Sequence, residues 1–122
     1  MKRILVIDDD TQMREMLRKV LERAGYEVED AADGKIGTNI HRKEPVDLVV
    51  TDLIMPEKEG IETIREFRRD FPQLKIIAIS GGGRIGADGY LSVAKTMGAH
   101  RIFSKPFDLK TFAETVKELL DS

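Results

Sequence analysis

Residues 4–10 read Ile-Leu-Val-Ile-Asp-Asp-Asp, an apolar run that stops abruptly at three carboxylates. A short run rich in β-branched residues is typical of a buried strand of a parallel sheet. From Thr11 the apolar residues take the spacing of an amphipathic helix, and Gly25 supplies its C-terminal stop. The sequence therefore predicts a buried strand, an acidic loop and a helix, in that order.

The same pattern of strand and then helix recurs along the rest of the chain. Further strands are expected at 26–30, 47–51, 75–79 and 101–104, and further helices at 33–42, 61–71, 90–97 and 109–120. Such alternation predicts an α/β fold in which helices cover both faces of a parallel sheet. Right-handed crossovers then leave only a few topologies.

Length and composition favour one globular domain, expected to span residues 1–122. The 20 basic and 22 acidic residues give a net charge of −2, which argues against direct nucleic-acid binding. The absence of cysteine excludes disulfides and thiolate chemistry. No stretch resembles a signal peptide or a membrane span, so the expectation is a cytoplasmic protein without membrane contact.

Polar side chains follow four of the five expected strands. Because parallel strands all point the same way, residues at their carboxyl ends gather at one edge of the sheet, where ligands of open α/β sheets bind. These residues are Asp8 and Asp9 after the first strand, Asp52 after the third, Ser80 after the fourth and Lys105 after the fifth. We expect the five side chains to form one site.

Three carboxylates at short range stay ionised together only with a cation between them. Mg²⁺ suits oxygen ligands and keeps water positions that a phosphate can take. A carboxylate such as that of Asp52 can attack phosphorus and form an aspartyl phosphate. The Ser80 hydroxyl and the Lys105 ammonium would then neutralise the phosphoryl group. The pattern predicts a Mg²⁺-dependent phosphoacceptor site.

Together these motifs resemble the receiver domain of two-component response regulators. The motifs are Asp8-Asp9, the segment Asp-Leu-Ile-Met-Pro at 52–56, Gly60, Ser80 and Lys-Pro-Phe at 105–107. Each motif alone is common, but all of them in this order, over essentially the whole chain, form a specific pattern. The resemblance implies a flavodoxin-like, doubly wound sheet of five parallel strands in the order 2-1-3-4-5, with five helices.

The resemblance also implies a function. Asp52 would accept a phosphoryl group from a sensor histidine kinase or a histidine phosphotransfer protein, and Ser80 and Lys105 would contact that group. The change would alter binding to an output domain or a downstream protein. The chain would then be a regulatory phosphoacceptor and not an enzyme, and the Lys105-Pro106 bond would be a cis peptide.

A set of metal ligands follows from the same resemblance. Asp9 would bind Mg²⁺ directly, and Asp8 would bind it through a water molecule. Asp52 and the backbone carbonyl of Ile54 would complete the ligands that the protein supplies.

Two other functions stay open at this level. A small phosphatase with an aspartyl nucleophile, of the haloacid dehalogenase type, needs a second aspartate two residues after the first, where Ile54 stands. A degenerate receiver that only binds partners is disfavoured by the intact acidic pair Asp8-Asp9, the acceptor Asp52 and Lys105. The segment Gly-Gly-Gly-Arg-Ile-Gly at 81–86 matches a dinucleotide fingerprint, but it follows the fourth strand, so a flexible loop is the preferred interpretation.

Three positions depart from the receiver pattern. Ile102 stands three residues before the lysine, where receivers usually carry Tyr or Phe, and Phe103 should face the other side of its strand. Glycines follow Ser80, where receivers more often have alanine and then a polar residue. Ile54 is apolar, where some receivers have a polar residue that helps to orient water. With Ile54 and Gly82 unable to position water, the sequence predicts slow self-dephosphorylation.

Other expectations concern residues outside the expected site. Asp10 should cap the first helix, since aspartate is a good N-cap. Ile36 and Ile40 should anchor the second helix to the core. His41, at the polar end of that helix, and His100, in a loop, should have no functional role.

Overall fold

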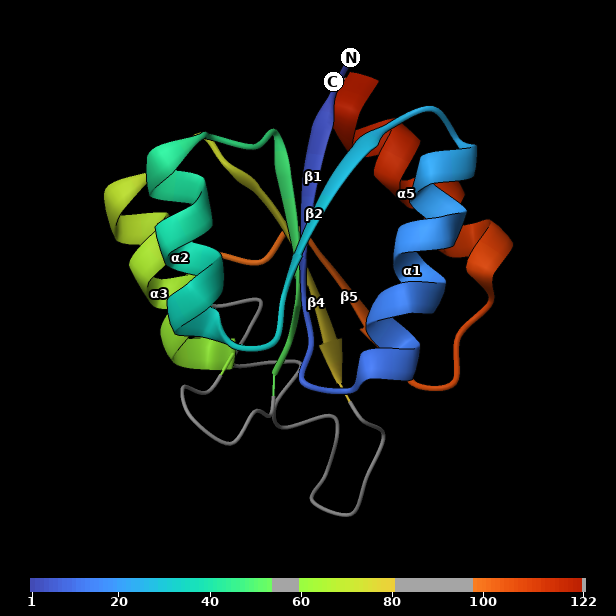
Figure 1. Cartoon of the computed structure of the whole chain (residues 1–122), viewed down its shortest axis with the longest axis horizontal. Helices are drawn as coiled ribbons and strands as arrows, with labels where there is room; N and C mark the ends of the chain where they lie inside the picture. The colour runs from blue at the N-terminus through green and yellow to red at the C-terminus, as the bar shows by residue number, and fades with distance from the viewer. Residues whose placement is uncertain (54–59, 81–97, 122) are drawn as a thin grey trace.

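This computed structural model describes residues 1–53, 60–80 and 98–121, and in this part of the chain strands and helices alternate except between the last two strands (Figure 1). In chain order the elements are β1 (Arg3–Ile7), α1 (Thr11–Arg23), β2 (Glu27–Ala31), α2 (Gly34–Lys43), β3 (Leu48–Asp52), α3 (Gly60–Asp70), β4 (Lys75–Ser80), β5 (Arg101–Ser104) and α5 (Leu109–Asp121). The helix expected at 90–97 and the glycine-rich segment at 81–86 lie outside the described residues.

The five strands form one parallel sheet in the order β2-β1-β3-β4-β5. In this register Ile4 of β1 lies between Val28 of β2 and Leu48 of β3. Helices α1 and α5 cover one face of the sheet, and α2 and α3 cover the other (Figure 1). The expected doubly wound, flavodoxin-like fold and its strand order are therefore confirmed.

Two apolar layers hold the helices to the sheet, because neighbouring residues of a strand point to opposite faces. One layer includes Leu5, Ile7, Val49, Ile64 and Phe67, and the other includes Ile4, Val6, Val50, Phe112 and Val116. Complete burial of a side chain such as Phe67 contributes about 1.5–3 kcal/mol relative to its exposure. Among the described helices, none has both the length and the apolar character needed to cross a membrane.

Helix α1 starts where the sequence predicts, directly after the acidic turn. The carboxylate of Asp10 accepts hydrogen bonds from the backbone nitrogens of Gln12 and Met13, at 3.0 and 3.3 Å. Asp10 is therefore the N-cap, as expected. Because the carboxylate of Asp10 caps α1, only Asp8 and Asp9 of this turn remain as candidates for the expected functional site.

The buried face of α2 differs from the expectation. Ile40 packs partly buried against the core, but Ile36 is 46% exposed. The buried residues of this helix are Gly34, Gly37, Thr38 and His41. A Cβ atom at Gly37 would clash with the side chain of Ile7, so the small residue lets α2 approach the sheet closely. A pattern of large apolar residues could not reveal a face built from small ones.

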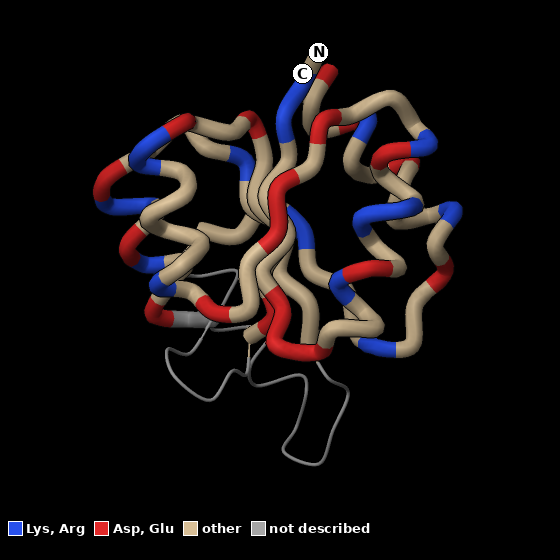
Figure 2. The backbone as a smooth tube through the Cα atoms, in the orientation of Figure 1, with Lys and Arg blue, Asp and Glu red and all other residues tan. Residues whose placement is uncertain are grey.

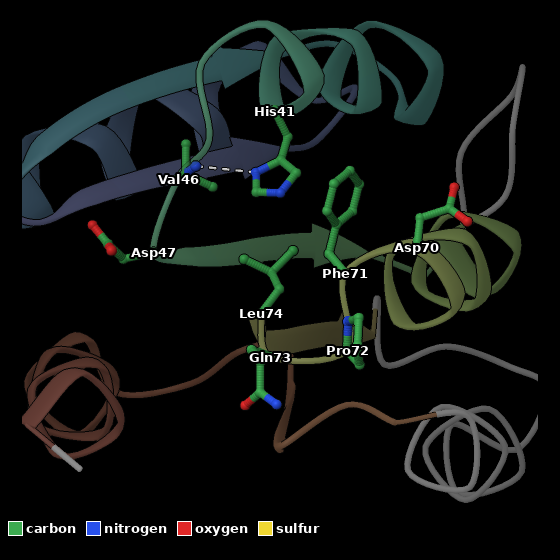
Figure 3. Close-up of a pocket in the computed structure, with 8 residues that line it drawn as sticks. All are labelled: His41, Val46, Asp47, Asp70, Phe71, Pro72, Gln73 and Leu74. Carbon is green, nitrogen blue, oxygen red and sulfur yellow. Dashed lines mark hydrogen bonds between the residues drawn. The ribbon is translucent and has the colours of Figure 1, made fainter.

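His41 is also placed differently from the expectation of a polar helix end. Its side chain is only 3% exposed and lies on one side of a surface pocket of about 420 Å³ (Figure 3). Its Nδ1 atom accepts a hydrogen bond from the backbone nitrogen of Val46 at 3.0 Å, and its ring packs edge-on against Phe67 and Phe71. Burial lowers the pKa of the imidazole, which favours the neutral form that can accept this bond. His41 thus links α2 to the segment that leads into β3.

Arg68 of α3 joins three loop carbonyls near the amino-terminal ends of β4 and β5. Its guanidinium donates to the carbonyls of Leu74 at 3.0 Å and Gly98 at 2.9 Å, and also to that of Pro72. We expect Arg68→Met to lower the free energy of unfolding by about 2–3 kcal/mol, because it removes charged hydrogen bonds from partly buried carbonyls.

Urea unfolding followed by circular dichroism measures the effect of Arg68→Met. Arg69→Met is the matched control, since the Arg69 side chain is 70% exposed and should change stability by no more than about 0.5 kcal/mol. Equal stability of the two variants would contradict the role assigned to Arg68.

Candidate functional site

The five residues singled out in the sequence gather at the carboxyl edge of the sheet. Asp8 and Asp9 follow β1, Asp52 ends β3, Ser80 ends β4 and Lys105 follows β5. Carboxylate oxygens of the three aspartates lie within 4.8 Å of one another. Figure 2 shows the acidic turn after β1 in red at this edge. The sheet therefore assembles the group of side chains that its parallel topology predicts.

The ammonium group of Lys105 lies between two of the carboxylates. Its Nζ atom is 3.2 Å from Oδ2 of Asp52 and 3.5 Å from Oδ2 of Asp8. Burial alone would lower the pKa of Lys105, but Asp52 and Asp8 outweigh it and raise the pKa above its ordinary value. Lys105 is therefore positively charged, and it partly neutralises the acidic group.

Backbone contacts fix Lys105 beside the end of β4. Its amide nitrogen donates to the carbonyl oxygen of Ser80 at 2.9 Å. Ser80 itself is 2% exposed, and the Lys105-Pro106 bond is cis, as expected. The ends of β4 and β5 are thus tied together at the site.

Asp8 is the most buried of the three aspartates. It is 1% exposed, and its Oδ1 atom accepts a hydrogen bond from the backbone nitrogen of Asp10 at 2.9 Å. Its Oδ2 atom is buried and accepts no hydrogen bond within the described residues. Burial raises the pKa of Asp8 to about 6; the bond from Asp10 opposes this, and the charge of Asp52 adds to it.

A divalent ion fits this arrangement of oxygen ligands. Asp8 and Asp52 are buried while Asp9 is exposed, so the carboxylates line a site that is open to solvent on one side. A hard cation between them would offset their mutual repulsion and satisfy the buried Oδ2 atom of Asp8. The backbone carbonyl of Ile54, the fourth expected ligand, lies outside the described residues.

The raised pKa of Asp8 predicts a specific dependence of stability on pH. Between about pH 4 and pH 6 the folded protein holds a proton at Asp8 more tightly than the unfolded chain does. The tighter proton binding stabilises the folded protein, and this stabilisation is lost as the pH rises through that window. Above pH 6 the ionised, buried carboxylate costs up to about 3 kcal/mol when no metal ion is present.

We expect Asp8→Asn to remove this cost, because the amide oxygen can still accept the bond from Asp10 and carries no charge. Urea unfolding of both proteins in EDTA measures the difference. The advantage of the variant should be small near pH 4 and should grow until about pH 6. A difference that does not change with pH would show that Asp8 is not buried as a charged group.

The residues before Lys105 face opposite sides of β5, as expected. Ile102 packs against the apolar layer of α3, whereas Phe103 packs in the other layer. The ring of Phe103 lies 5.3 Å from that of Phe107 and 5.6 Å from that of Phe112, centre to centre. The site thus has an aliphatic residue at 102 and an aromatic cluster on the far side of the strand.

Arg14 also contacts the acidic turn, and the sequence pattern did not single it out. Its Nη1 atom donates to the backbone carbonyl of Asp8 at 2.8 Å. In the sequence Arg14 looks like one of several charged residues on the outer face of α1. The one signal in the sequence is that Arg14 lies near the start of a helix that begins directly after the acidic residues, which places its side chain within reach of them.

Several known response regulators are similar to this chain in sequence. The family model for the response regulator receiver domain matches residues 4–117. The response regulator receiver protein CpdR of Brucella abortus is 35% identical over 120 residues, which cover 98% of both chains. The chemotaxis protein CheY of Thermotoga maritima is 33% identical over 119 residues, which cover 97% of both.

A solved structure agrees with these sequence relatives. The response regulator receiver domain protein (CheY-like) from Methanospirillum hungatei JF-1 superposes with a TM-score of 0.89 at 31% identity. The match covers 99% of this chain and 94% of that one. Sequence and fold therefore point to the same group of proteins.

Proposed function

Because the chain belongs to the response regulator receiver domains of two-component systems, we propose that Asp52 is its phosphoryl acceptor. The observation that carries the proposal is the surroundings of Asp52. This carboxylate ends the central strand β3, lies within 4.8 Å of two other carboxylates and pairs with the ammonium of Lys105. Phosphorylation by a small phosphodonor, with Mg²⁺ or with EDTA, tests the proposal.

In the proposed reaction a carboxylate oxygen of Asp52 attacks the phosphorus of the donor. The bond between phosphorus and the donor histidine nitrogen breaks, and the imidazole leaves with its electron pair. The product is an acyl phosphate on Asp52. Lys105 donates to an oxygen of the transferred group, and the Ser80 hydroxyl donates to another. Lys105 is already paired with Asp52 before transfer, so its charge lowers the cost of placing negative charge in the site.

We propose Mg²⁺ as the cofactor, held by the carboxylates of Asp8, Asp9 and Asp52 and by the carbonyl of Ile54. When bound, the ion would supply positive charge that offsets the charge of the transferred phosphoryl group. Asp9, the exposed member, would bind it directly, and Asp8 would bind it through water. The support for this set is the close approach of the carboxylates and the buried Oδ2 atom of Asp8.

The proposed donor of the phosphoryl group is a sensor histidine kinase or a histidine phosphotransfer protein, and the proposed location of the reaction is the cytoplasm. Residues 1–122 would act as a single receiver domain that changes its binding to an output domain or a downstream protein. The local event would be movement of Ser80 and Lys105 towards phosphorylated Asp52. An aspartyl-nucleophile phosphatase is not favoured, since the family and the fold are those of receivers. A degenerate receiver is disfavoured by the assembled acidic group.

The phosphorylated protein should lose its phosphoryl group slowly. Ile54 and Gly82 offer no side-chain group that could hold a water molecule for attack on phosphorus; both lie outside the described residues. We expect purified, phosphorylated protein to persist for minutes or longer, and Ile54→Asn to shorten its lifetime. Loss of radiolabel with time measures both, with Ile54→Ala as control. A wild-type half-life of only seconds would contradict the prediction.

A further inference from the structure

One cation lies against the acidic turn without a part in the chemistry described above. Arg14 lies in the first two turns of α1, and its side chain is 17% exposed. While Nη1 donates to the carbonyl of Asp8 at 2.8 Å, Nε lies 3.9 Å from a carboxylate oxygen of Asp30. Asp30 belongs to β2 and also pairs with Arg18 at 3.0 Å. Arg14 thus joins α1, the acidic turn and β2.

The carbonyl that Arg14 holds belongs to the peptide between Asp8 and Asp9. Other contacts already fix Asp8: its nitrogen donates to Ala31 at 3.1 Å, and its Oδ1 atom accepts from Asp10. Because a peptide group is planar, fixing this carbonyl also fixes the direction in which the chain enters Asp9. Asp9 is exposed, so its orientation depends on that peptide more than on packing.

We propose that Arg14 is a positioning residue for the metal-binding aspartates: it holds the Asp8–Asp9 peptide in the orientation that lets both carboxylates reach one ion. The inference rests on the proposed function, because it assumes that these aspartates bind Mg²⁺. Arg14 touches neither the ion nor the phosphoryl group in this scheme. Residues that orient metal ligands typically change metal affinity by 10- to 100-fold when they are replaced.

Charge and geometry predict opposite results when Arg14 is replaced. Removing a positive charge beside three carboxylates makes the site more negative, which by itself tightens the binding of a cation. Removing the hydrogen bond frees the Asp8–Asp9 peptide, which weakens binding. The sign of the change therefore separates a positioning role from a purely electrostatic one.

Isothermal titration with Mg²⁺ alone provides the first test. Arg14→Met should bind Mg²⁺ about 10-fold more weakly than the wild type. Arg14→Lys, which keeps the charge but replaces the guanidinium by one ammonium nitrogen, should have an affinity between the two. Arg18→Met is the matched control: it removes the same charge one turn further along α1, where Arg18 pairs with Asp30 and Glu22, and its affinity should be unchanged or slightly higher. Unchanged or tighter binding by Arg14→Met would overturn the proposal.

Amide hydrogen exchange in EDTA gives a second readout that needs no metal. The Asp10 amide, which donates to Asp8 Oδ1, should exchange about 10-fold faster in Arg14→Met, while the core amide of Val50 keeps its wild-type rate. Equal acceleration at Val50 would indicate general destabilisation and would also overturn the proposal. If the wild type bound no Mg²⁺, the proposed metal site would be wrong. An unchanged exchange rate of the Asp10 amide in Arg14→Met would refute the positioning role of Arg14, whether or not the protein binds Mg²⁺.

Discussion

Asp52→Asn will reduce the phosphorylation of this protein by a small phosphodonor and Mg²⁺ to background. Asparagine keeps the shape of the side chain at the end of β3, but its amide oxygen is a poor nucleophile and cannot form a stable acyl phosphate. The wild type should incorporate label only when Mg²⁺ is present. Incorporation of radiolabel into the intact protein measures the difference.

Two controls make the result for Asp52→Asn specific. Asp121→Asn, at the exposed end of α5, should be labelled like the wild type. Asp52→Asn should also be at least as stable as the wild type in EDTA, because it removes one of three mutually repelling carboxylates. Full labelling of Asp52→Asn would place the acceptor elsewhere, and the neighbouring Asp8 and Asp9 would be the next residues to replace.

Lys105→Met will slow phosphorylation on the order of 100-fold and will strengthen Mg²⁺ binding at the same time. The first effect follows from the loss of a preorganised cation aimed at the transferred group. The second follows because the ammonium pairs with Asp52 and Asp8, two of the proposed Mg²⁺ ligands. Single-turnover labelling measures the rate, and calorimetric titration measures the affinity.

Lys110→Met is the matched control for Lys105→Met. It removes the same charge from an exposed position in α5 and should change neither the rate nor the affinity. If Lys105→Met were phosphorylated at the wild-type rate, Lys105 would not contact the transferred group. Weaker Mg²⁺ binding in this variant would contradict the competition between the ammonium and the ion.

The sequence predicted the elements of the sheet and the location of the site for a simple physical reason. Buried parallel strands are short apolar runs, so their ends are marked where polar residues begin, as at Asp8 and Asp52. Once the strands are known to be parallel, these ends must meet at one edge. The strand order came from the resemblance to receivers and not from the pattern itself.

Contacts between side chains and distant backbone atoms could not be predicted in the same way. His41 binds the nitrogen of Val46, Arg68 binds loop carbonyls and Arg14 binds the carbonyl of Asp8. Each contact depends on where the tertiary structure brings a backbone atom, which residue periodicity does not encode. The buried face of α2 could not be predicted for a related reason. It includes Gly37, whose small size allows the close approach of helix and sheet, and a search for large apolar residues does not find it.

The surroundings of Ile102 bear on how a change at Asp52 would spread. An aliphatic side chain in the layer of α3 has no ring to rotate, and the aromatic cluster of Phe103 lies on the other side of β5. The bond from the Lys105 nitrogen to the Ser80 carbonyl couples the ends of β4 and β5 directly. Movement of Lys105 towards a phosphoryl group would therefore be transmitted through the backbone.

Location of the acyl phosphate tests the central claim most directly. Phosphorylated wild-type protein is treated with borohydride, which reduces an aspartyl phosphate to homoserine, and the peptides are sequenced by mass spectrometry. Homoserine at position 52, present with Mg²⁺ and absent with EDTA, is the expected result. Homoserine at position 8 or 9, or none at any position, would contradict the account.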